Sequence, residues 1–377
     1  MKQIQMVDLK SQYDKIKKDV DSAIQNVIDN SAFIKGKDVA AFENNLASFL
    51  GVKHVIGCAN GTDALQIAFM ALGLKQGDEV ITVPFTFIAT VEAIALLGLK
   101  VVYVDVDSDT FTMNTSQLEA VITKNTKAIV PVHLYGQCAN MEDIMNIARK
   151  YNIAVVEDTA QALGTDYFFV NGVKQKAGTI GDIGCTSFFP SKNLGCYGDG
   201  GAIYTNNDLL AEQIRMVVNH GSKIKYYHET IGVNSRLDTL QAAILNVKLQ
   251  YLDTYNFARK KAAAYYDKAF KNEKEVQIPL RASYSDHIFH QYTLKLINKD
   301  RNKLQTLLAA EGIPTMVYYP VSLHVQKAYE NLGYKKGDMP ISETLTKQVL
   351  SLPMHTELDE QQLEYITSKF IDILNSI

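Results

Sequence analysis

The sequence predicts an α/β protein built on a largely parallel sheet that is covered by helices. Between residues 50 and 205, short apolar runs alternate with helical patterns, which is typical of parallel strands joined by helices. The chain has 377 residues, 47% of them hydrophobic, so it can bury a large core and form two unequal domains. We expect strands at residues 54–58, 79–83, 101–106, 128–133, 153–157, 183–188 and 202–205.

Two further patterns describe the organisation of the chain. Asn171-Gly172 lies between apolar runs and predicts a two-residue hairpin on the surface. From Ser235 to Phe270 the pattern is one long helical stretch, and shorter mixed elements follow it. We therefore predict a large domain at residues 1–250, which includes an N-terminal helix, and a small C-terminal domain at residues 251–377.

Composition and charge exclude several classes of function. The 38 basic and 41 acidic residues give a net charge of −3 without a run of either sign, so we expect neither nucleic acid nor a membrane as partner. The polar N-terminus lacks the apolar core of a signal peptide. Cys58, Cys138, Cys185 and Cys196 lie far apart, without histidine at metal-ligand spacing. We expect no metal site, no disulfide framework and a cytoplasmic location.

The segment TSFFPSKNLGCYGDGGAIYTN carries an unusual lysine. An apolar strand leads into a turn with Ser187, Ser191 and Lys192, and a glycine-rich return follows. Open α/β sheets bind ligands beyond the carboxyl ends of their strands, so Lys192 is a candidate functional amine. The alternative is a solvated loop lysine, because most lysines are exposed. The glycines precede a strand and do not open a helix, which argues against a dinucleotide-binding fingerprint.

A second cluster, VVEDTAQALG, brings a carboxylate to the end of a predicted strand. Asp158 follows the apolar residues directly, and Gln161 comes one turn later. A carboxylate beside a pyridine nitrogen keeps that nitrogen protonated and makes the ring an electron sink. Asp158 is equally compatible with a helix cap in front of Thr159.

The third cluster, CANGTDALQIAFMAL, combines a strand, a tight turn at Asn60-Gly61 and an apolar-periodic helix. The first-turn amides of such a helix can hold a phosphate. The alternative is an ordinary helix start with Thr62 or Asp63 as cap. Taken together, the three strand ends offer a phosphate cradle, a pyridinium partner and an amine, and pyridoxal 5′-phosphate (PLP) requires that set.

In these segments the chain resembles the sugar aminotransferases of the DegT/DnrJ/EryC1/StrS family. NGTDAL, PFTFIAT, EDTAQALG, SFFPSKNLGCYGDGG and GVNSRLDTLQAA are similar to that family's motifs in that family's order, over nearly the whole chain. The resemblance implies a fold-type I PLP-dependent transferase, similar to aspartate aminotransferase. It implies a large domain with a mainly parallel seven-stranded sheet and a smaller C-terminal α/β domain.

The resemblance also implies a role for individual residues. Lys192 would carry the cofactor as a Schiff base and move a proton, with Asp158 at the pyridine nitrogen and Gln161 near the phenolic oxygen. Asn234 is similar to a residue that reaches the phosphate of the neighbouring subunit, so a homodimer with composite active sites is implied. The remaining cofactor contacts would be the stacking ring Phe87 and the phosphate ligands Gly61, Thr62 and Ser187. By pattern alone, a phenylalanine like Phe87 belongs more often to the core.

The substrate implied by the resemblance is a nucleotide-linked keto sugar, with L-glutamate as amino donor. The chain is most similar to enzymes that aminate UDP-2-acetamido-2-deoxy-3-oxo-glucuronate for lipopolysaccharide O-antigen, and related members act on dTDP-linked 3-keto-6-deoxyhexoses. Arg236 would pair with the uronate carboxylate, although a structural ion pair is the alternative. We predict further sugar-nucleotide contacts at His220, Tyr318, Tyr319 and His324, with core packing as the alternative for the tyrosines.

Two other readings of the same fold compete with an aminotransferase. Sugar dehydratases of this fold have a histidine in place of the lysine, so Lys192 argues against them. A non-enzymatic regulator predicts the loss of Lys192, Asp158 or the phosphate cradle, and the sequence retains all three. Residues 226–228 are a candidate loop over the nucleotide, and we interpret His287 and His290 in HIFH as structural.

Overall fold

Seven strands form the central sheet of the computed structural model, which describes residues 3–377. Their order is β1-β9-β8-β5-β4-β2-β3. Neighbours pair in parallel except at β9, which is antiparallel to both β1 and β8. The strands are β1 (His54–Cys58), β2 (Glu79–Thr82), β3 (Lys100–Tyr103), β4 (Thr126–Ile129), β5 (Ala154–Asp158), β8 (Ile183–Ser187) and β9 (Gly201–Thr205). The predicted α/β class and mainly parallel seven-stranded sheet are confirmed.

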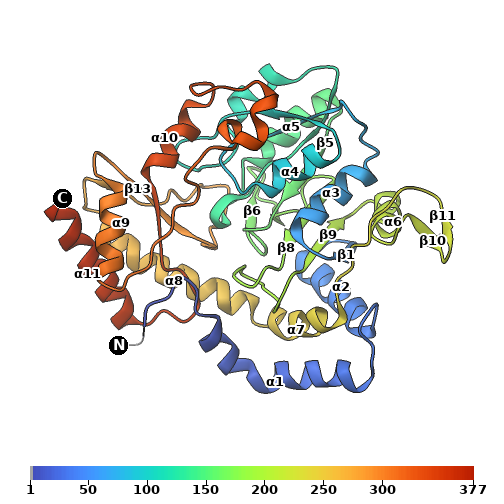
Figure 1. Cartoon of the computed structure of the whole chain (residues 1–377), viewed down its shortest axis with the longest axis horizontal. Coiled ribbons are helices and arrows are strands. Elements are labelled where there is room, and N and C mark those ends of the chain that lie inside the picture. The colour runs from blue at the N-terminus through green and yellow to red at the C-terminus, as the bar shows by residue number, and fades with distance from the viewer. Residues whose placement is uncertain (1–2) are drawn as a thin grey trace.

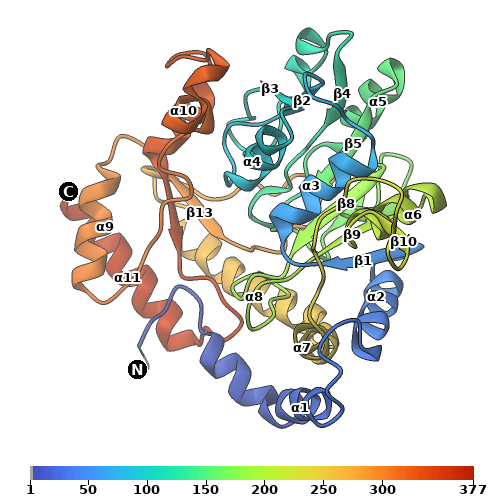
Figure 2. The same cartoon turned by 45° about the vertical axis from the view of Figure 1, so that its right-hand side comes forward.

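Helices cover both faces of this sheet, and Figure 2 shows α3 and α4 in front of it. Alternate strand residues face opposite sides: Val80 packs in the cluster that contains α3 and α4, and Ile81 in the cluster that contains α5. Near-continuous apolar runs are therefore required, because both faces are buried. The covering helices are α2 (Lys37–Leu50), α3 (Gly61–Ala71), α4 (Ala89–Leu96), α5 (Met141–Tyr151), α6 (Asp208–Val217) and α7 (Thr239–Leu249).

The C-terminal part of the chain builds a second apolar core around a three-stranded antiparallel sheet, β12-β13-β14. The predicted long helix is two helices, α7 and α8, which are separated at Gln250 and Tyr251. The division into two domains near residue 250 stays a prediction. The elements here are α8 (Leu252–Phe270), β12 (Val276–Gln277), β13 (Tyr292–Leu296), α9 (Arg301–Ala310), β14 (Val349–Leu352) and α11 (Glu360–Ser376).

One segment of the C-terminal part returns to the large sheet. Helix α10 (Pro340–Gln348) begins at the carboxylate of Asp105, which accepts hydrogen bonds from the amides of Ile341 at 2.8 Å and Ser342 at 3.0 Å. Asp105 is 3% exposed, so this cap is buried. The contact fixes the start of α10 to the residues that follow β3, at the edge of the large sheet.

Two hairpins project from the sheet. In the first, β6 (Asp166–Phe168) pairs with β7 (Lys174–Lys176). The predicted two-residue turn is wrong, because Phe169 already pairs with Val173 and three residues lie between them. The third is Gly172, whose φ of +83° completes this type of turn. The second hairpin, β10 (Ser222–Ile224) and β11 (Tyr227–His228), extends away from the sheet beside α6 (Figure 1).

The N-terminal helix α1 (Leu9–Asp29) packs against α7. Among residues 3–377, none of the helices combines the length and the apolar character that a bilayer crossing requires. The same residues contain no cluster of histidine, cysteine, aspartate and glutamate arranged to hold a metal ion. Short 3₁₀ helices complete the fold: η1 (Thr115–Gln117), η2 (Glu119–Val121), η3 (Leu134–Gly136), η4 (Leu323–Val325) and η5 (Lys327–Leu332).

Candidate active site

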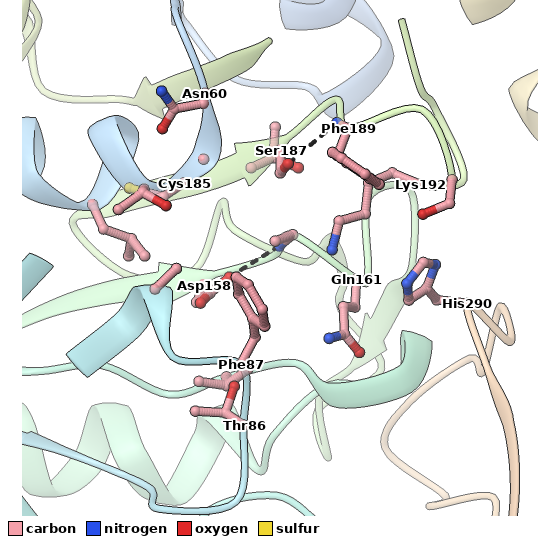
Figure 3. Close-up of a pocket in the computed structure, with 18 of the residues that line it drawn as sticks. Asn60, Thr86, Phe87, Asp158, Gln161, Cys185, Ser187, Phe189, Lys192 and His290 are labelled. Atoms are coloured by element: carbon pink, nitrogen blue, oxygen red, sulfur yellow. Dashed lines mark hydrogen bonds between the residues drawn. The ribbon is translucent and has the colours of Figure 1, made fainter. Parts of the chain in front are cut away.

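A cavity of about 450 Å³ lies beyond the carboxyl ends of the parallel strands (Figure 3). Residues that follow β1, β2 and β4 line it, together with the last residues of β5 and β8. The C-terminal part of the chain supplies another wall through His290, Gln291, Tyr318 and Tyr319. This is the position at which an open α/β sheet binds its ligand.

One end of the cavity is an anion cradle. Helix α3 begins at Gly61, and its cap is Asn60, whose side chain accepts a hydrogen bond of 2.8 Å from the amide of Asp63. The alternative of Thr62 or Asp63 as cap is therefore wrong. The amides of Gly61 and Thr62 come first in the helix and face the cavity without a partner inside the helix.

Ser187, the last residue of β8, completes this cradle. Its hydroxyl oxygen accepts a hydrogen bond from the amide of Phe189, so its proton is free to donate into the cavity. Gly61 is required beside it, because a Cβ on that residue would lie 2.7 Å from the Cβ of Ser187. Two amides and a hydroxyl thus converge from α3 and β8, and they suit a phosphate dianion.

Asp158 forms the floor of the cavity at the end of β5, where it is 6% exposed. The hydroxyl of Thr90 donates to one carboxylate oxygen at 2.8 Å, and the amide of Ala160 donates to the other at 3.1 Å. The alternative of a helix cap is wrong, because residues 160–164 form a turn. The buried carboxylate can accept a further hydrogen bond from a ligand in the cavity.

Lys192 points into the cavity from the loop that follows β8 (Figure 3). Among residues 3–377, its amine makes no hydrogen bond or ion pair. Burial lowers the pKa of Lys192 to about 8, and the negative charge of Asp158 partly opposes this shift. The side chain is partly buried and faces the cavity, so the alternative of a solvated loop lysine is wrong.

Gln161 and Phe87 line the same cavity as Lys192 (Figure 3). The amide oxygen of Gln161 accepts from the backbone of Tyr135 at 2.8 Å, and its nitrogen donates to the hydroxyl of Tyr319 at 2.9 Å. Gln161 thus has one N–H left for a ligand. Phe87 is 56% exposed in the cavity wall, so the core alternative is wrong and its ring face is open for stacking.

This donor set fits PLP. The amides and the hydroxyl match the phosphate, the Asp158 carboxylate matches the pyridine nitrogen, the Gln161 N–H matches the phenolic oxygen, and Phe87 matches the ring face. The Lys192 amine has no competing partner in the described chain and can bond to the aldehyde carbon. Together with the sheet, this set defines a fold-type I PLP-dependent transferase.

The predicted sugar-nucleotide contacts divide into two groups. Tyr318 and Tyr319 line the cavity. His324 does not: it is 1% exposed, and its ring nitrogens lie 2.8 Å from the Ser322 hydroxyl and 3.0 Å from the Glu343 carboxylate. With both nitrogens bonded inside the protein, His324 has no atom left for a sugar in this arrangement.

Three other predicted residues lie outside the cavity of their own chain. His220 and Asn234 are exposed, and the backbone of Asn219 pairs with that of Asn234. Arg236 is partly buried and makes neither an ion pair nor a hydrogen bond within residues 3–377, so its alternative of a structural ion pair is not realised in this chain. In the chain, His220 precedes the hairpin β10–β11, and Asn234 and Arg236 follow it.

Two residues of the site, His290 and Thr90, were not predicted from the sequence. His290 was expected to be structural, but it lines the cavity, so that interpretation needs correction. His287 is buried outside the cavity, and its ring stacks on Phe289 with 3.9 Å between the ring centroids. Thr90 was also missed, although a hydroxyl in the first turn of the largely apolar helix α4 was an available signal.

Comparison with known proteins identifies the family. The profile of the DegT/DnrJ/EryC1/StrS aminotransferase family matches residues 14–371. A pleiotropic regulatory protein of Geobacillus stearothermophilus is 46% identical over 371 residues, 98% of both chains. The UDP-2-acetamido-2-deoxy-3-oxo-D-glucuronate aminotransferase of Pseudomonas aeruginosa is 47% identical over 363 residues, 96% of this chain and 98% of the relative.

A solved structure shows the same fold. The crystal structure of S. venezuelae DesV in complex with a ketimine intermediate superposes with a TM-score of 0.96 at 36% identity and covers 100% of both chains. The chain belongs to the DegT/DnrJ/EryC1/StrS aminotransferase family. It is a PLP-dependent sugar aminotransferase.

Proposed function

We propose that this protein transfers the amino group of L-glutamate to C3 of UDP-2-acetamido-2-deoxy-3-oxo-D-glucuronate, for lipopolysaccharide O-antigen. The observation that carries the proposal is the 47% identity to the P. aeruginosa enzyme of that name over nearly the whole of both chains. The cavity supports it, because Lys192, Asp158 and the phosphate cradle are all present and face one space.

Each residue of the site has a defined task in this proposal. PLP, when bound, supplies a protonated pyridine ring that takes up electrons from the carbon next to the transferred nitrogen. Asp158 would hold the proton on that ring nitrogen, and Gly61, Thr62 and Ser187 would hold the phosphate. Lys192 would hold the cofactor through Nζ and, as a free amine, would accept and return a proton at that atom.

Recognition of the uronate is assigned to Arg236. A guanidinium group can bind a carboxylate through two parallel hydrogen bonds, and Arg236 is free of partners in the described part of its own chain. Tyr318 and Tyr319 are proposed to contact the sugar nucleotide from the wall of the cavity. Tyr319 accepts from Gln161, so its own proton is available to a sugar oxygen.

We further propose that two copies of the chain share their active sites. Asn234, Arg236 and His220 lie outside the cavity of their own chain and would serve the cavity of the partner. Exposed apolar side chains occur in the hairpin segment at residues 224–231 and at residues 33–34, which pair with the backbone at 238–239, and such exposure is typical of an interface. They are Phe33, Ile34, Ile224, Tyr226, Tyr227 and Ile231, with exposures from 46% to 83%.

A cytoplasmic location is part of the same proposal. The four cysteines are unpaired and buried, which suits a reducing compartment. Activated nucleotide sugars and L-glutamate are both present in the cytoplasm.

The name of the G. stearothermophilus relative makes a regulator the second candidate. A regulator needs no free amine and no buried carboxylate in its cavity, and this chain has both. The two functions therefore differ in one measurable property, which is turnover of a keto sugar.

A substrate panel tests the proposal. Purified protein with PLP and L-glutamate is given UDP-2-acetamido-2-deoxy-3-oxo-glucuronate, generated in place by its dehydrogenase, or a dTDP-linked 3-keto-6-deoxyhexose, and release of 2-oxoglutarate is measured. Lys192→Ala is the matched control. Turnover of the uronate is expected. Turnover of only the deoxyhexose would replace the uronate assignment, and silence with both sugars while PLP stays bound would favour the regulator.

A further inference from the structure

Gln291 has a side-chain amide without a partner in the wall of the active-site cavity. The residue lines the cavity and is 8% exposed. Within residues 3–377, its side chain makes no hydrogen bond, yet neither of its amide atoms is fully enclosed. A primary amide has two N–H donors and an acceptor oxygen, and burying them without partners costs free energy. The amide of Gln291 is therefore a candidate group for binding a ligand.

Two contacts fix the position of Gln291. Its backbone amide donates to the carbonyl oxygen of Tyr135 at 3.3 Å, and the backbone amide of Tyr135 donates to Gln161 at 2.8 Å. The preceding residue, His290, has its Nδ1 atom 3.2 Å from the side-chain oxygen of Asn193. Gln291 is therefore tied to the residue that holds Gln161 and to the loop that carries the active-site lysine.

These contacts place Gln291 at the end of the cavity where amines are exchanged. Figure 3 shows Lys192, Gln161 and His290 on the same side of the cavity, opposite Asn60 at the start of α3. The phosphate of PLP fits the cradle at α3, so the aldehyde carbon of the cofactor would lie toward Lys192. The carbon atom that gives up its amino group must approach the same end.

The amino donor brings a carboxylate to this end of the cavity, attached to the carbon atom that carries the amino group. Lys192 is the only lysine or arginine among residues 3–377 that lines the cavity, and its amine serves the reaction itself. Arg259 does not line the cavity, and it donates to the carbonyl oxygens of Phe289 and His290 at 3.2 Å each and of Met354 at 3.0 Å. The cavity wall of the described chain therefore offers no further cation for this carboxylate.

We infer that the side-chain N–H groups of Gln291 bind the α-carboxylate of the amino donor, and the inference rests on the proposed function for the identity of that donor. A neutral amide suits a site that two different substrates occupy in turn. An arginine in its place would be left as a buried charge without a partner when a keto sugar replaced the amino acid, whereas an amide can also bond to a hydroxyl or acetamido group. Gln291 is thus a specificity-determining residue for the donor.

The donor half of the reaction tests this role without any sugar. Protein loaded with PLP is mixed with L-glutamate at increasing concentration, and the absorbance of the bound cofactor is followed. Gln291→Met keeps the length of the side chain and removes both N–H donors. Because the lost hydrogen bond is to a charged group, the half-saturating concentration of glutamate should rise about 10- to 150-fold. Gln291→Glu adds a negative charge at the same place, so the concentration should rise further.

Two controls separate loss of binding from structural damage. Cofactor-free Gln291→Met should bind PLP as tightly as the wild type, because Gln291 acts on the donor alone. His287→Leu is the matched variant, since His287 is buried in the same segment but lies outside the cavity, and it should leave the half-saturating concentration unchanged. An unchanged concentration in both Gln291 variants would overturn the inference and point to a cation of the partner subunit. An equal loss in His287→Leu, or weaker PLP binding in Gln291→Met, would overturn it too.

The inference and the proposed function fail in different ways. A protein that reacts with L-glutamate but aminates no uronate would refute the sugar assignment and leave the role of Gln291 intact. Equal responses of the wild type and the Gln291 variants would refute only the inference. A wild type whose cofactor absorbance did not change with L-glutamate would overturn both.

Discussion

The hydroxyl of Thr90 donates a hydrogen bond of 2.8 Å to the carboxylate of Asp158 in the floor of the cavity. Thr90 is fully buried in the first turn of α4, so solvent cannot replace this donor. The contact fixes the orientation of the carboxylate, which would pair with the pyridine nitrogen of the cofactor. The orientation of the Asp158 carboxylate therefore depends on a residue 68 positions earlier in the chain.

Thr90→Val keeps the shape of the side chain and removes this donor. Because a hydrogen bond to a charged group contributes about 1.5–3 kcal/mol, we expect PLP to bind about 10- to 150-fold more weakly. The measurement is a PLP titration of the cofactor-free protein, followed by absorbance. Thr90→Ser retains the hydroxyl and should bind PLP nearly as tightly as the wild type, and equal loss in both variants would contradict this role.

The pH dependence of PLP capture follows from the state of Lys192. The attacking group is the neutral amine, and burial lowers its pKa to about 8. The capture rate should rise about tenfold per pH unit below pH 8 and level off above it, because the neutral fraction then saturates. Stopped-flow absorbance after mixing with PLP measures the rate. Lys192→Ala should show no covalent capture at any pH, and a midpoint near the usual lysine value would refute the lowered pKa.

Gly61 allows α3 to start against the end of β8. In Gly61→Ala the new Cβ would lie 2.7 Å from the Cβ of Ser187, so the helix start must shift. Overpacking of this kind costs about 1–3 kcal/mol, and chemical denaturation should detect the loss. Gly61→Ala combined with Ser187→Gly removes the opposing atom and should recover stability. Failure of the double variant to recover would locate the strain elsewhere.

Shared active sites predict complementation between inactive subunits. Lys192→Ala and Asn234→Ala each inactivate their homodimers if Asn234 serves the partner's cavity. When the two variants are mixed and reassorted, half of the dimers are mixed, and each has one intact site of two. About a quarter of the wild-type activity should therefore return. If activity stays absent after verified subunit exchange, Asn234 serves the cavity of its own subunit and the active sites are not shared.

The sequence predicted the parts of the site that follow directly from apolar strands. Asp158, Ser187 and Gly61 were found because each stands at the boundary between a buried run and a turn, a local signal. The position of Lys192 also followed from this rule, although its burial did not. For these residues, the neighbouring sequence alone was sufficient to predict that they lie at the edge of the sheet.

The parts that were missed depend on contacts between distant segments. His290 reaches the cavity from the C-terminal part of the chain, where Arg259 and Asn193 contact it, and the spacing in HIFH contains no signal of either contact. The break between α7 and α8 falls at Gln250 and Tyr251, which are neither glycine nor proline, so propensity could not locate it. The position of His290 and the break between α7 and α8 both depend on tertiary packing, which local sequence does not reveal.

The buried cap of α10 by Asp105 couples two distant parts of the sequence. The amides of Ile341 and Ser342 donate to a carboxylate that follows β3, at the edge of the large sheet. Asp105 is 3% exposed, so water cannot replace either partner if the two parts separate without unfolding further. The C-terminal part of the chain therefore contributes to the stability of the large sheet as well as to the wall of the cavity.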